Sequence, residues 1–304
     1  MAITVYNLKK WYKMLIGQSI MHVDQNIGRI FLVDEIKGYY NDLTKKVTED
    51  KEILYSTRLP RNVIDNGDRV LFPTQIFQYG LGSFDLYLLK KEDIYLKKFK
   101  KCLEWAYETQ QEDGAWNNFY FIHPKNPYSA MSQGEGASLL IRGFKLYKDE
   151  KYIKAANRAI NFMLKHVSEG GTASFIGNEK VLLEYTHQPV VLNGLIFALF
   201  GLYDFILVSS NNKYKDIFYD YINSLKKLLP RFDNGYWSMY NCEGMIASLF
   251  YHKLHIAQLY ALYAITNENI FKEYAIKWER YLNTKYYKNK AFFVKVFQKI
   301  LEKK

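Results

Sequence analysis

The chain has 304 residues, of which 49% are hydrophobic and 24% charged, as is typical of one large folded domain or a main domain with a smaller attachment. Its two cysteines, Cys102 and Cys242, exclude a disulfide framework and a four-thiol metal site. The formal net charge of +11 favours an anionic partner, but the basic residues are scattered and no nucleic-acid motif is present, so we expect no nucleic-acid binding.

Residues 1–70 are expected to form an N-terminal arm or small β region packed on the main domain, which comprises residues 71–304. The run 27–33 is β-like, and Asn66-Gly67 is a hairpin turn signal. For Tyr39, Tyr40 and Arg58, packing on the surface is favoured over reaching into a cleft. The start of the chain is basic but lacks the continuous apolar run of a signal peptide, which predicts a cytoplasmic location.

From Phe72 onward the apolar spacing is helical, and the predicted helices form pairs joined by short polar turns. The pairs are 73–90 with 92–111, 131–147 with 150–168, 190–208 with 212–229, and 246–265 with 268–283, and an amphipathic tail helix follows from 291 to 304. Glycines recur in the connectors at intervals of roughly 60 residues, which is typical of a repeated helical hairpin. We expect a mainly α fold: an α/α barrel or open toroid of about four helical hairpins, with the connectors around a cleft.

One stretch, from Val181 to Phe205, combines reactive side chains with a core helix. Glu184 and Tyr185 stand near its start, His187 follows, and from residue 190 onward about 16 residues are nearly all apolar. Such a run is too short to span a bilayer comfortably, so it predicts a buried helix and no integral membrane segment. The stretch is therefore expected to form one wall of a functional site.

Polar and aromatic side chains gather in the connectors and at the starts of the helices that follow them. Besides Glu184, Tyr185 and His187, the candidates are Gln75, Gln78, Tyr79, Tyr128, Gln133, Glu135, Tyr240, Tyr251, His252 and His255. Glycines crowd the same helix starts, which indicates close helix packing or close approach of a ligand: Gly80, Gly82, Gly134, Gly136 and Gly194. The chain has no nucleophile elbow and no phosphate-binding loop, and no carboxylate matches the spacing of the two histidines, so we expect no metal.

Several motifs in colinear order carry a resemblance to a known family. They are FPTQIFQYGLGSFD, YSAMSQGEGASLLIRGF, LLEYTHQPVVLNGLIFALFGLYD, and FYHKLHIAQL followed by IFKEYAIKWERYL, and they extend from about residue 70 to 283. Together they resemble the C-terminal catalytic region of the D-glucuronyl C5-epimerases, which convert glucuronic to iduronic acid within heparan-type chains. The resemblance implies an α/α-barrel catalytic domain, a tyrosine-lined cleft, and chemistry at C5 that requires no cofactor.

The resemblance also implies roles for individual residues. Glu184 and Tyr185 fall on the family's acid-tyrosine pair, Tyr240 on a catalytic tyrosine, and Tyr251 on the tyrosine that precedes the His-x-x-His helix. We expect Glu184 and Tyr251 to serve opposite faces of the sugar, Tyr240 to assist proton transfer, and Tyr185 to hydrogen-bond the substrate. The expected substrate-binding residues are Gln75, Gln78, Tyr79, Tyr128, Gln133, Arg142, His187 and His255.

The chain departs from the family after Tyr240, where the family's Asp-Leu-Arg-His is replaced by residues 241–244, Asn-Cys-Glu-Gly. An arginine that the resemblance implies for holding the substrate carboxylate is therefore absent. Arg142 and Arg58 are the candidate replacements, although Arg142 lies in an apolar helix and is as consistent with a structural role.

These observations predict an epimerase that inverts C5 of a hexuronic acid in an acidic polysaccharide of the heparan or heparosan kind. The same proton abstraction followed by elimination would make the chain a uronate polysaccharide lyase. Hydrolysis would need two opposed carboxylates, for which Glu184 and Glu135 are the candidate pair. A non-catalytic protein that binds acidic glycans is the alternative from another class. The expected partner is an acidic polysaccharide or oligosaccharide, and a homodimer is left open.

Overall fold

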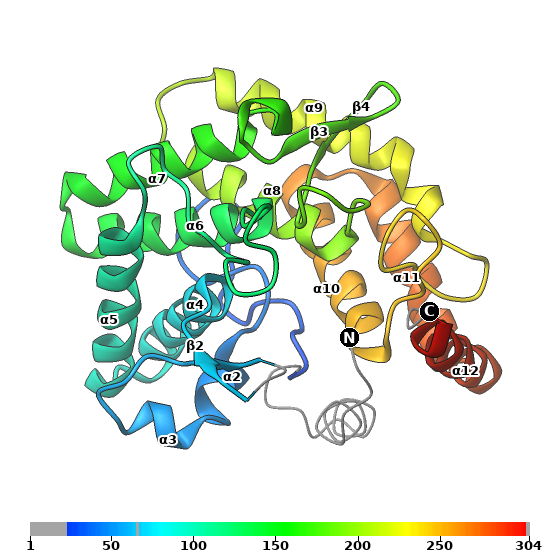
Figure 1. Cartoon of the computed structure of the whole chain (residues 1–304), viewed down its shortest axis with the longest axis horizontal. Coiled ribbons are helices and arrows are strands. Elements are labelled where there is room, and N and C mark those ends of the chain that lie inside the picture. Colours follow the sequence, from blue (N-terminus) through cyan, green and yellow to red (C-terminus); the bar gives the residue numbers. More distant parts are fainter. Residues whose placement is uncertain (1–22, 65–66, 302–304) are drawn as a thin grey trace.

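Four pairs of helices form the body of the protein, and a short turn joins the two helices of each pair (Figure 1). The computed structural model describes residues 23–64 and 67–301. The pairs are α4 (Pro73–Lys90) with α5 (Asp93–Thr109), α6 (Ala130–Tyr147) with α7 (Glu150–Leu164), α8 (Leu192–Ile206) with α9 (Lys213–Leu228), and α10 (Leu249–Thr266) with α11 (Asn269–Asn283). These helices lie where the periodicity of the sequence predicts them, which confirms a mainly α fold of the α/α barrel or open toroid type.

The first helix of each pair is buried on most sides, whereas the second is amphipathic and covers it. In α8, for example, Tyr203 and Ile206 are the two residues that are not fully buried. Helices α4, α6, α8 and α10 pack side by side in that order. A Cβ atom at Gly201 of α8 would lie 2.3 Å from Cα of Gly134 in α6, so these glycines let the two backbones touch.

The segment before residue 71 contains the small β-hairpin that the sequence predicts and two short helices that it does not. Strands β1 (Asn62–Val63) and β2 (Arg69–Val70) pair antiparallel, whereas in the run 27–33 Ile27 forms an isolated bridge to Asn41. Helices α2 (Thr44–Thr48) and α3 (Lys51–Leu54) are too short to show a helical period in the sequence. Some parts of the sequence prediction lie outside the described residues. These are the start of the chain, which lacks a signal-peptide pattern, Asn66 of the turn signal, and the last residues of the tail.

This N-terminal segment contacts both ends of the row of inner helices. Helix α2 packs on α4, where a Cβ atom at Gly82 would lie 2.5 Å from the carbonyl oxygen of Leu43. Gly82 therefore makes room for the backbone that leads into α2. At the other end of the row, Asp24 pairs with Lys253 of α10, with 3.2 Å between Oδ1 and Nζ. The N-terminal segment thus bridges α4 and α10.

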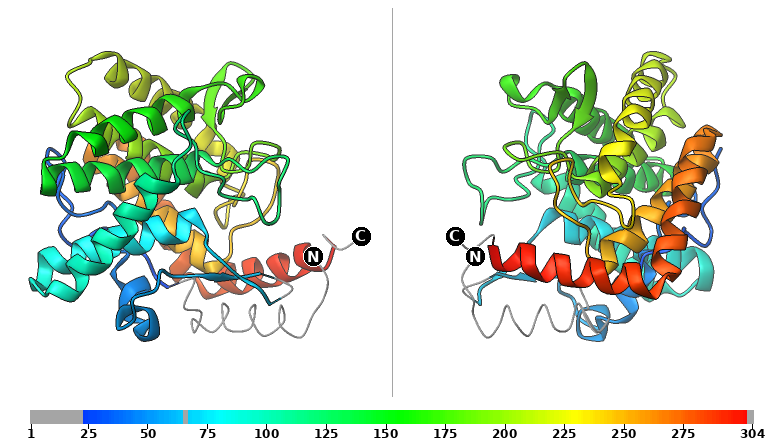
Figure 2. Two further views of the ribbon diagram at one scale, coloured as in Figure 1. Left: turned by 60° about the vertical axis from the view of Figure 1, so that its left-hand side comes forward. Right: turned by 90° about the vertical axis from the view of Figure 1, so that its right-hand side faces the viewer.

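The connectors between the pairs gather on one side of the ring (Figure 2) and hydrogen-bond to one another. Four of their elements are absent from the sequence prediction. Strands β3 (Ala173–Ile176) and β4 (Glu179–Leu182) form a hairpin, and η1 (Val167–Glu169) and η2 (Leu229–Phe232) are 3-10 helices. The amide of Ala130 donates to the carbonyl of Leu183 at 2.9 Å, and the amide of Leu192 donates to that of Tyr240 at 3.1 Å. These bonds hold the connectors around the starts of α6 and α8.

The last helix, α12 (Lys285–Leu301), begins before its predicted start at Ala291 and lies along one edge of the molecule (Figure 2). Ala291 is its one fully buried residue, and Phe293 and Phe297 are exposed. None of the helices within residues 23–64 and 67–301 combines the length and apolar character needed to cross a bilayer.

Candidate active site

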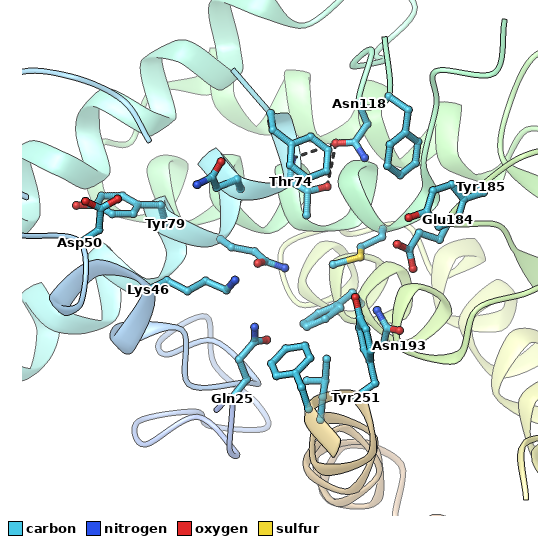
Figure 3. A pocket seen from close by; sticks show the side chains of 18 residues that line it. Gln25, Lys46, Asp50, Thr74, Tyr79, Asn118, Glu184, Tyr185, Asn193 and Tyr251 are labelled. Carbon is cyan, nitrogen blue, oxygen red and sulfur yellow. Dashed lines mark hydrogen bonds between the residues drawn. The ribbon is translucent and has the colours of Figure 1, made fainter. Parts of the chain in front are cut away.

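A pocket opens where the connectors meet the starts of the inner helices, and the N-terminal segment closes it from the other side (Figure 3). Its lining residues are Gln25, Lys46, Asp50, Phe72, Thr74, Gln75, Gln78, Tyr79, Asn118, Phe119, Met131, Glu184, Tyr185, Asn193, Phe197, Phe250, Tyr251 and Leu254. The mixture of aromatic rings, amides and a few charged groups is suited to a polar ring-shaped ligand such as a sugar.

A cluster of one carboxyl and three phenols lies at this pocket: Glu184, Tyr185 and Tyr251 line it, and Tyr240 packs against Tyr251. The four groups are close enough that each of them shifts the pKa of others in the cluster. The rings of Tyr240 and Tyr251 have centroids 4.8 Å apart, and the ring of Tyr185 stacks on Phe119 at 4.5 Å. Two connectors and the first turn of α10 supply these residues, so the tertiary fold brings together side chains that are far apart in the sequence.

Burial controls the protonation of this cluster. It raises the pKa of Glu184 from its usual 4.5 to about 8, and the hydrogen bond from Tyr185 only partly opposes the change. Burial and then the neighbouring carboxylate of Glu184 hold the pKa values of Tyr240 and Tyr251 above the usual 10. A carboxyl that titrates near neutral pH beside neutral phenols is a set of groups suited to giving and taking protons.

Glu184 is held against the start of α8. A Cβ atom at Gly194 would lie 2.5 Å from Oε2 of Glu184 and 2.6 Å from its Cβ, so only glycine leaves space for this carboxyl. Oε2 of Glu184 and Oδ1 of Asn193 are buried without a protein partner, and both residues line the pocket. Gly194 therefore allows the close approach of the Glu184 side chain, and the two oxygens are available to a ligand or a water molecule.

A second polar group, around Glu135, lies behind the pocket on α4 and α6. Glu135 is fully buried, its Oε1 accepts a 2.7 Å hydrogen bond from Nε2 of Gln78, and its Oε2 has no protein partner. Burial holds its pKa well above the usual value. Burial also lowers the pKa of Lys46 to about 8, an effect that the charge of Glu135 opposes. Because Glu135 does not line the pocket, it does not face Glu184 as hydrolysis would require.

The predicted substrate-binding residues divide into those at the pocket and those away from it. Gln75, Gln78 and Tyr79 line it. Tyr128 lies outside, with its hydroxyl on Oε1 of Gln111 at 3.3 Å. His187 is exposed and lies against another histidine ring, that of His123, with 4.6 Å between centroids.

Three further residues that were predicted to bind the substrate instead hydrogen-bond other parts of the protein. Gln133 is buried and donates to the carbonyl of Gly114 at 3.1 Å, while its Oε1 accepts from the amide of Trp116. His255 is also buried, with Nδ1 3.0 Å from Oγ of Ser238. These residues hold the connectors in place and do not reach the pocket.

Arg142 is the third of these predicted substrate-binding residues. It is a structural cation and does not line the pocket. Its Nη1 lies 2.6 Å from Oδ2 of Asp204, and its Nη2 donates to the carbonyl of Gly38 at 3.0 Å. Arg58, the other candidate for the missing arginine, pairs with Glu52 at the exposed surface. Neither guanidinium lies at the pocket, because both lie against protein oxygens elsewhere.

Several pocket residues were not predicted from the sequence. Asn193 stands in the apolar run after Glu184. An amide within an apolar run is a sequence signal that could have identified this residue. Asn118, whose Oδ1 accepts from the hydroxyl of Thr74 at 2.9 Å, follows one of the repeated connector glycines. Gln25 and Lys46 come from the N-terminal segment, where no motif marks them. No group of three or more His, Cys, Asp or Glu side chains in the described part of the chain is arranged to hold a metal ion.

Comparisons with known proteins identify relatives. Residues 100–280 match the model of the family described as D-glucuronyl C5-epimerase C-terminus. The chain is 26% identical over 227 residues to a D-glucuronyl C5-epimerase of Caenorhabditis elegans, covering 64% of this chain and 36% of that protein. It is 32% identical over 155 residues to the uncharacterized protein MJ1128 of Methanocaldococcus jannaschii, covering 49% of this chain and 50% of that protein. The chain thus spans half or less of the length of these relatives.

Among solved structures, an inactive variant of the α-1,6-mannanase GH76A of Salegentibacter sp. HEL1_6, in complex with α-1,6-mannotriose, matches with a TM-score of 0.49. The match has 14% sequence identity and covers 69% of this chain and 63% of that chain.

Proposed function

The chain belongs to the D-glucuronyl C5-epimerase C-terminus family, and from this premise we propose that it inverts C5 of a hexuronic acid within an acidic polysaccharide. The observation that carries the proposal is the cluster of Glu184, Tyr185, Tyr240 and Tyr251 at the pocket. It offers a proton acceptor and a proton donor at one pocket. Asp50, the other carboxylate of the lining, lies beside Tyr79 across the pocket from Glu184 (Figure 3).

The reaction explains why such groups are needed. The C5 hydrogen of a uronic acid is weakly acidic, because the adjacent carboxylate is already negative and loss of the proton adds a second charge. Inversion needs a base on one face of C5, an acid on the other, and stabilisation of the charge that develops on the carboxylate. A pocket that excludes water strengthens each of these interactions.

In the proposed mechanism, Glu184 and Tyr251 act on opposite faces. Glu184 as a carboxylate takes the C5 proton, and the phenol of Tyr251 gives its proton to the other face, so one C5–H bond breaks and a new one forms. The reverse reaction exchanges their roles. After turnover the proton on Glu184 returns to Tyr251 through the hydroxyls of Tyr185 and Tyr240, which belong to the same cluster. The pKa of about 8 at Glu184 supports this cycle, since both of its protonation states are accessible near neutral pH.

The test is deuterium incorporation at C5 of a glucuronate-containing polymer in D2O, followed by NMR or mass spectrometry. We expect the wild-type protein to incorporate deuterium and the Glu184→Gln and Tyr251→Phe variants to lose most of this activity. Tyr260→Phe is the matched control, because the hydroxyl of Tyr260 in α10 donates to Glu279 of α11 at 2.7 Å and Tyr260 does not line the pocket. Incorporation by the wild-type that survives unchanged in both site variants would refute the assignment.

The same assay separates the alternatives. A lyase would abstract the same proton and then release unsaturated uronate, which absorbs ultraviolet light, so a rise in absorbance would identify elimination. A non-catalytic glycan-binding protein would bind the polymer and incorporate no deuterium. Exchange without a rise in absorbance is the outcome that the proposed epimerase predicts.

A further inference from the structure

The pocket must solve an electrostatic problem that the carboxyl and phenol cluster does not solve. A uronate brings a carboxylate into a partly buried site, and the negative charge on that carboxylate grows as the C5 proton leaves. An unpaired anion in such a site is costly, so a cation or a set of donors has to face it. Glu184 is itself acidic, so it cannot supply this cation.

Lys46 occupies a position that suits this task. It is carried by α2, and Figure 3 shows its amine directed into the pocket from the side opposite Glu184. Among the pocket-lining residues of the described chain, Lys46 is the single lysine or arginine. The two arginines that the sequence suggested, Arg142 and Arg58, are bound to Asp204 and Glu52 away from the pocket.

The backbone around Lys46 is anchored in the fold. The amide of Thr44 donates to Oδ1 of Asp42 at 2.9 Å, and Asp42 also pairs with Arg29 at 3.0 Å. Further upstream, Arg142 donates to the carbonyl of Gly38 at 3.0 Å. A lysine on a surface loop would lose entropy on binding, whereas these contacts position the start of α2 before a ligand arrives.

The rest of the pocket complements a sugar that is oriented by this lysine. Three amide oxygens at the lining are buried without a protein partner, those of Gln25, Gln75 and Asn193. Buried acceptors of this kind match the hydroxyl groups of a hexuronic acid, which donate hydrogen bonds. One charged donor and several acceptors make a set that distinguishes a uronate from a neutral sugar.

We propose that Lys46 is the carboxylate-binding residue of this pocket, so that the N-terminal segment, which lies outside the matched range 100–280, confers specificity for uronates. The proposal rests on the proposed function for the identity of the ligand. In the bound state the ammonium of Lys46 faces the uronate carboxylate, and C5 lies between Glu184 and Tyr251. The lysine stabilises the charge that accumulates on the carboxylate during proton transfer.

The test compares binding of two polymers, a glucuronate-containing polysaccharide and the same polysaccharide with its carboxyl groups reduced to primary alcohols. Isothermal titration gives the affinity of each for the wild-type protein and for Lys46→Met, Lys46→Arg and Lys45→Met. We expect Lys46→Met to lose about 10- to 100-fold in affinity for the uronate polymer, as for a hydrogen bond to a charged group, and to keep its affinity for the reduced polymer. Lys46→Arg should retain most of the preference for uronate.

Lys45→Met is the matched control, because Lys45 is the neighbouring lysine of α2 and its side chain is exposed. It should bind both polymers as the wild-type does. If Lys46→Met weakens both polymers equally, or neither, Lys46 has no carboxylate-specific role and the proposal is overturned.

The epimerase assignment and the proposed role of Lys46 can be refuted separately. A wild-type protein that exchanges no C5 proton would end the epimerase assignment, while the comparison of the two polymers would still decide the role of Lys46. Conversely, a Lys46→Met variant that keeps wild-type affinity and C5 exchange would overturn the role of the lysine and leave the epimerase assignment intact.

Discussion

Arg142 and Asp204 form an ion pair in the centre of the molecule, with 2.6 Å between Nη1 and Oδ2 and with 1% and 2% of their side chains exposed. The hydroxyl of Tyr40 donates to the other oxygen of Asp204 at 2.8 Å, and Arg142 also binds the carbonyl of Gly38. One network therefore ties α6 and α8 to the N-terminal segment. Tyr40 and its neighbour Tyr39 are buried in this network, so they pack in the core and do not lie at the pocket.

Breaking this pair should destabilise the fold. Arg142→Met leaves the buried carboxylate of Asp204 without its cation, and we expect the free energy of unfolding in urea to fall by about 3–5 kcal/mol. The double variant Arg142→Met with Asp204→Leu removes both charges and should recover much of that loss. Arg58→Met is the control, because its partner Glu52 is exposed and such pairs contribute about 1 kcal/mol or less. Equal stability of the two single variants would contradict a structural role for Arg142.

Glu184 should make the stability of the protein depend on pH. Its pKa rises from 4.5 in the unfolded chain to about 8 in the folded protein, so the folded state holds the proton more tightly. The contribution of this group to the free energy of unfolding is therefore fully present below pH 4.5, and this contribution is lost as the pH rises through about 8. Glu184→Gln removes this loss, and we expect the variant to be more stable than the wild-type at pH 8.5 by on the order of 2–4 kcal/mol.

The measurement is the difference in unfolding free energy between the variant and the wild-type from pH 5 to pH 8.5. The difference should shrink toward pH 5, where the wild-type carboxyl is protonated in the folded protein. Glu112→Gln controls for the general loss of a negative charge, because Glu112 is exposed in a connector. A difference that does not change with pH would show that Glu184 is ionised in the folded protein across the range.

The phenols of Tyr240 and Tyr251 should affect catalysis more than binding. Tyr251→Phe removes the proposed acid and Tyr240→Phe interrupts the link to Tyr185, so each should lower the rate of C5 exchange by roughly 10²–10⁴-fold, as for loss of a general acid or base. Both variants keep the aromatic ring, so affinity for the polymer should change much less. Exchange at the wild-type rate in Tyr240→Phe would exclude the proposed path for proton return.

The sequence predicted the helices well because each inner helix has a long apolar run and each outer helix has a clear stripe of apolar residues along one face. The acid and tyrosine cluster was predicted from motifs, and the structure brings those four residues together. The position of Arg142 was not predictable, because apolar neighbours on a helix do not indicate whether its guanidinium meets a ligand or a distant carboxylate. Lys46 was missed for a related reason: a five-residue helix has no detectable period, and its place at the pocket depends on tertiary contacts of the N-terminal segment.

Ser238 should position the connector that carries Tyr240 without touching the substrate. Its Oγ lies 2.8 Å from Nδ1 of His252 and 3.0 Å from Nδ1 of His255, and its amide also donates to His252. Burial lowers the pKa of His252 to about 3, so this ring stays neutral and can accept these hydrogen bonds at any working pH. Since Tyr240 follows two residues later, these bonds fix where its hydroxyl stands relative to α10.

Ser238→Ala should therefore lower the rate of C5 exchange by about 10-fold through misplacement of Tyr240, with little change in KM and a loss of about 1–2 kcal/mol in stability. The control is Ser224→Ala, because Ser224 is also buried and its Oγ accepts a hydrogen bond from the amide of Lys180 at 3.0 Å, and neither residue lines the pocket. That variant should lose similar stability and keep the wild-type rate. If both variants slow exchange equally, the effect comes from general destabilisation, and the hydrogen bonds of Ser238 have no specific part in aligning Tyr240.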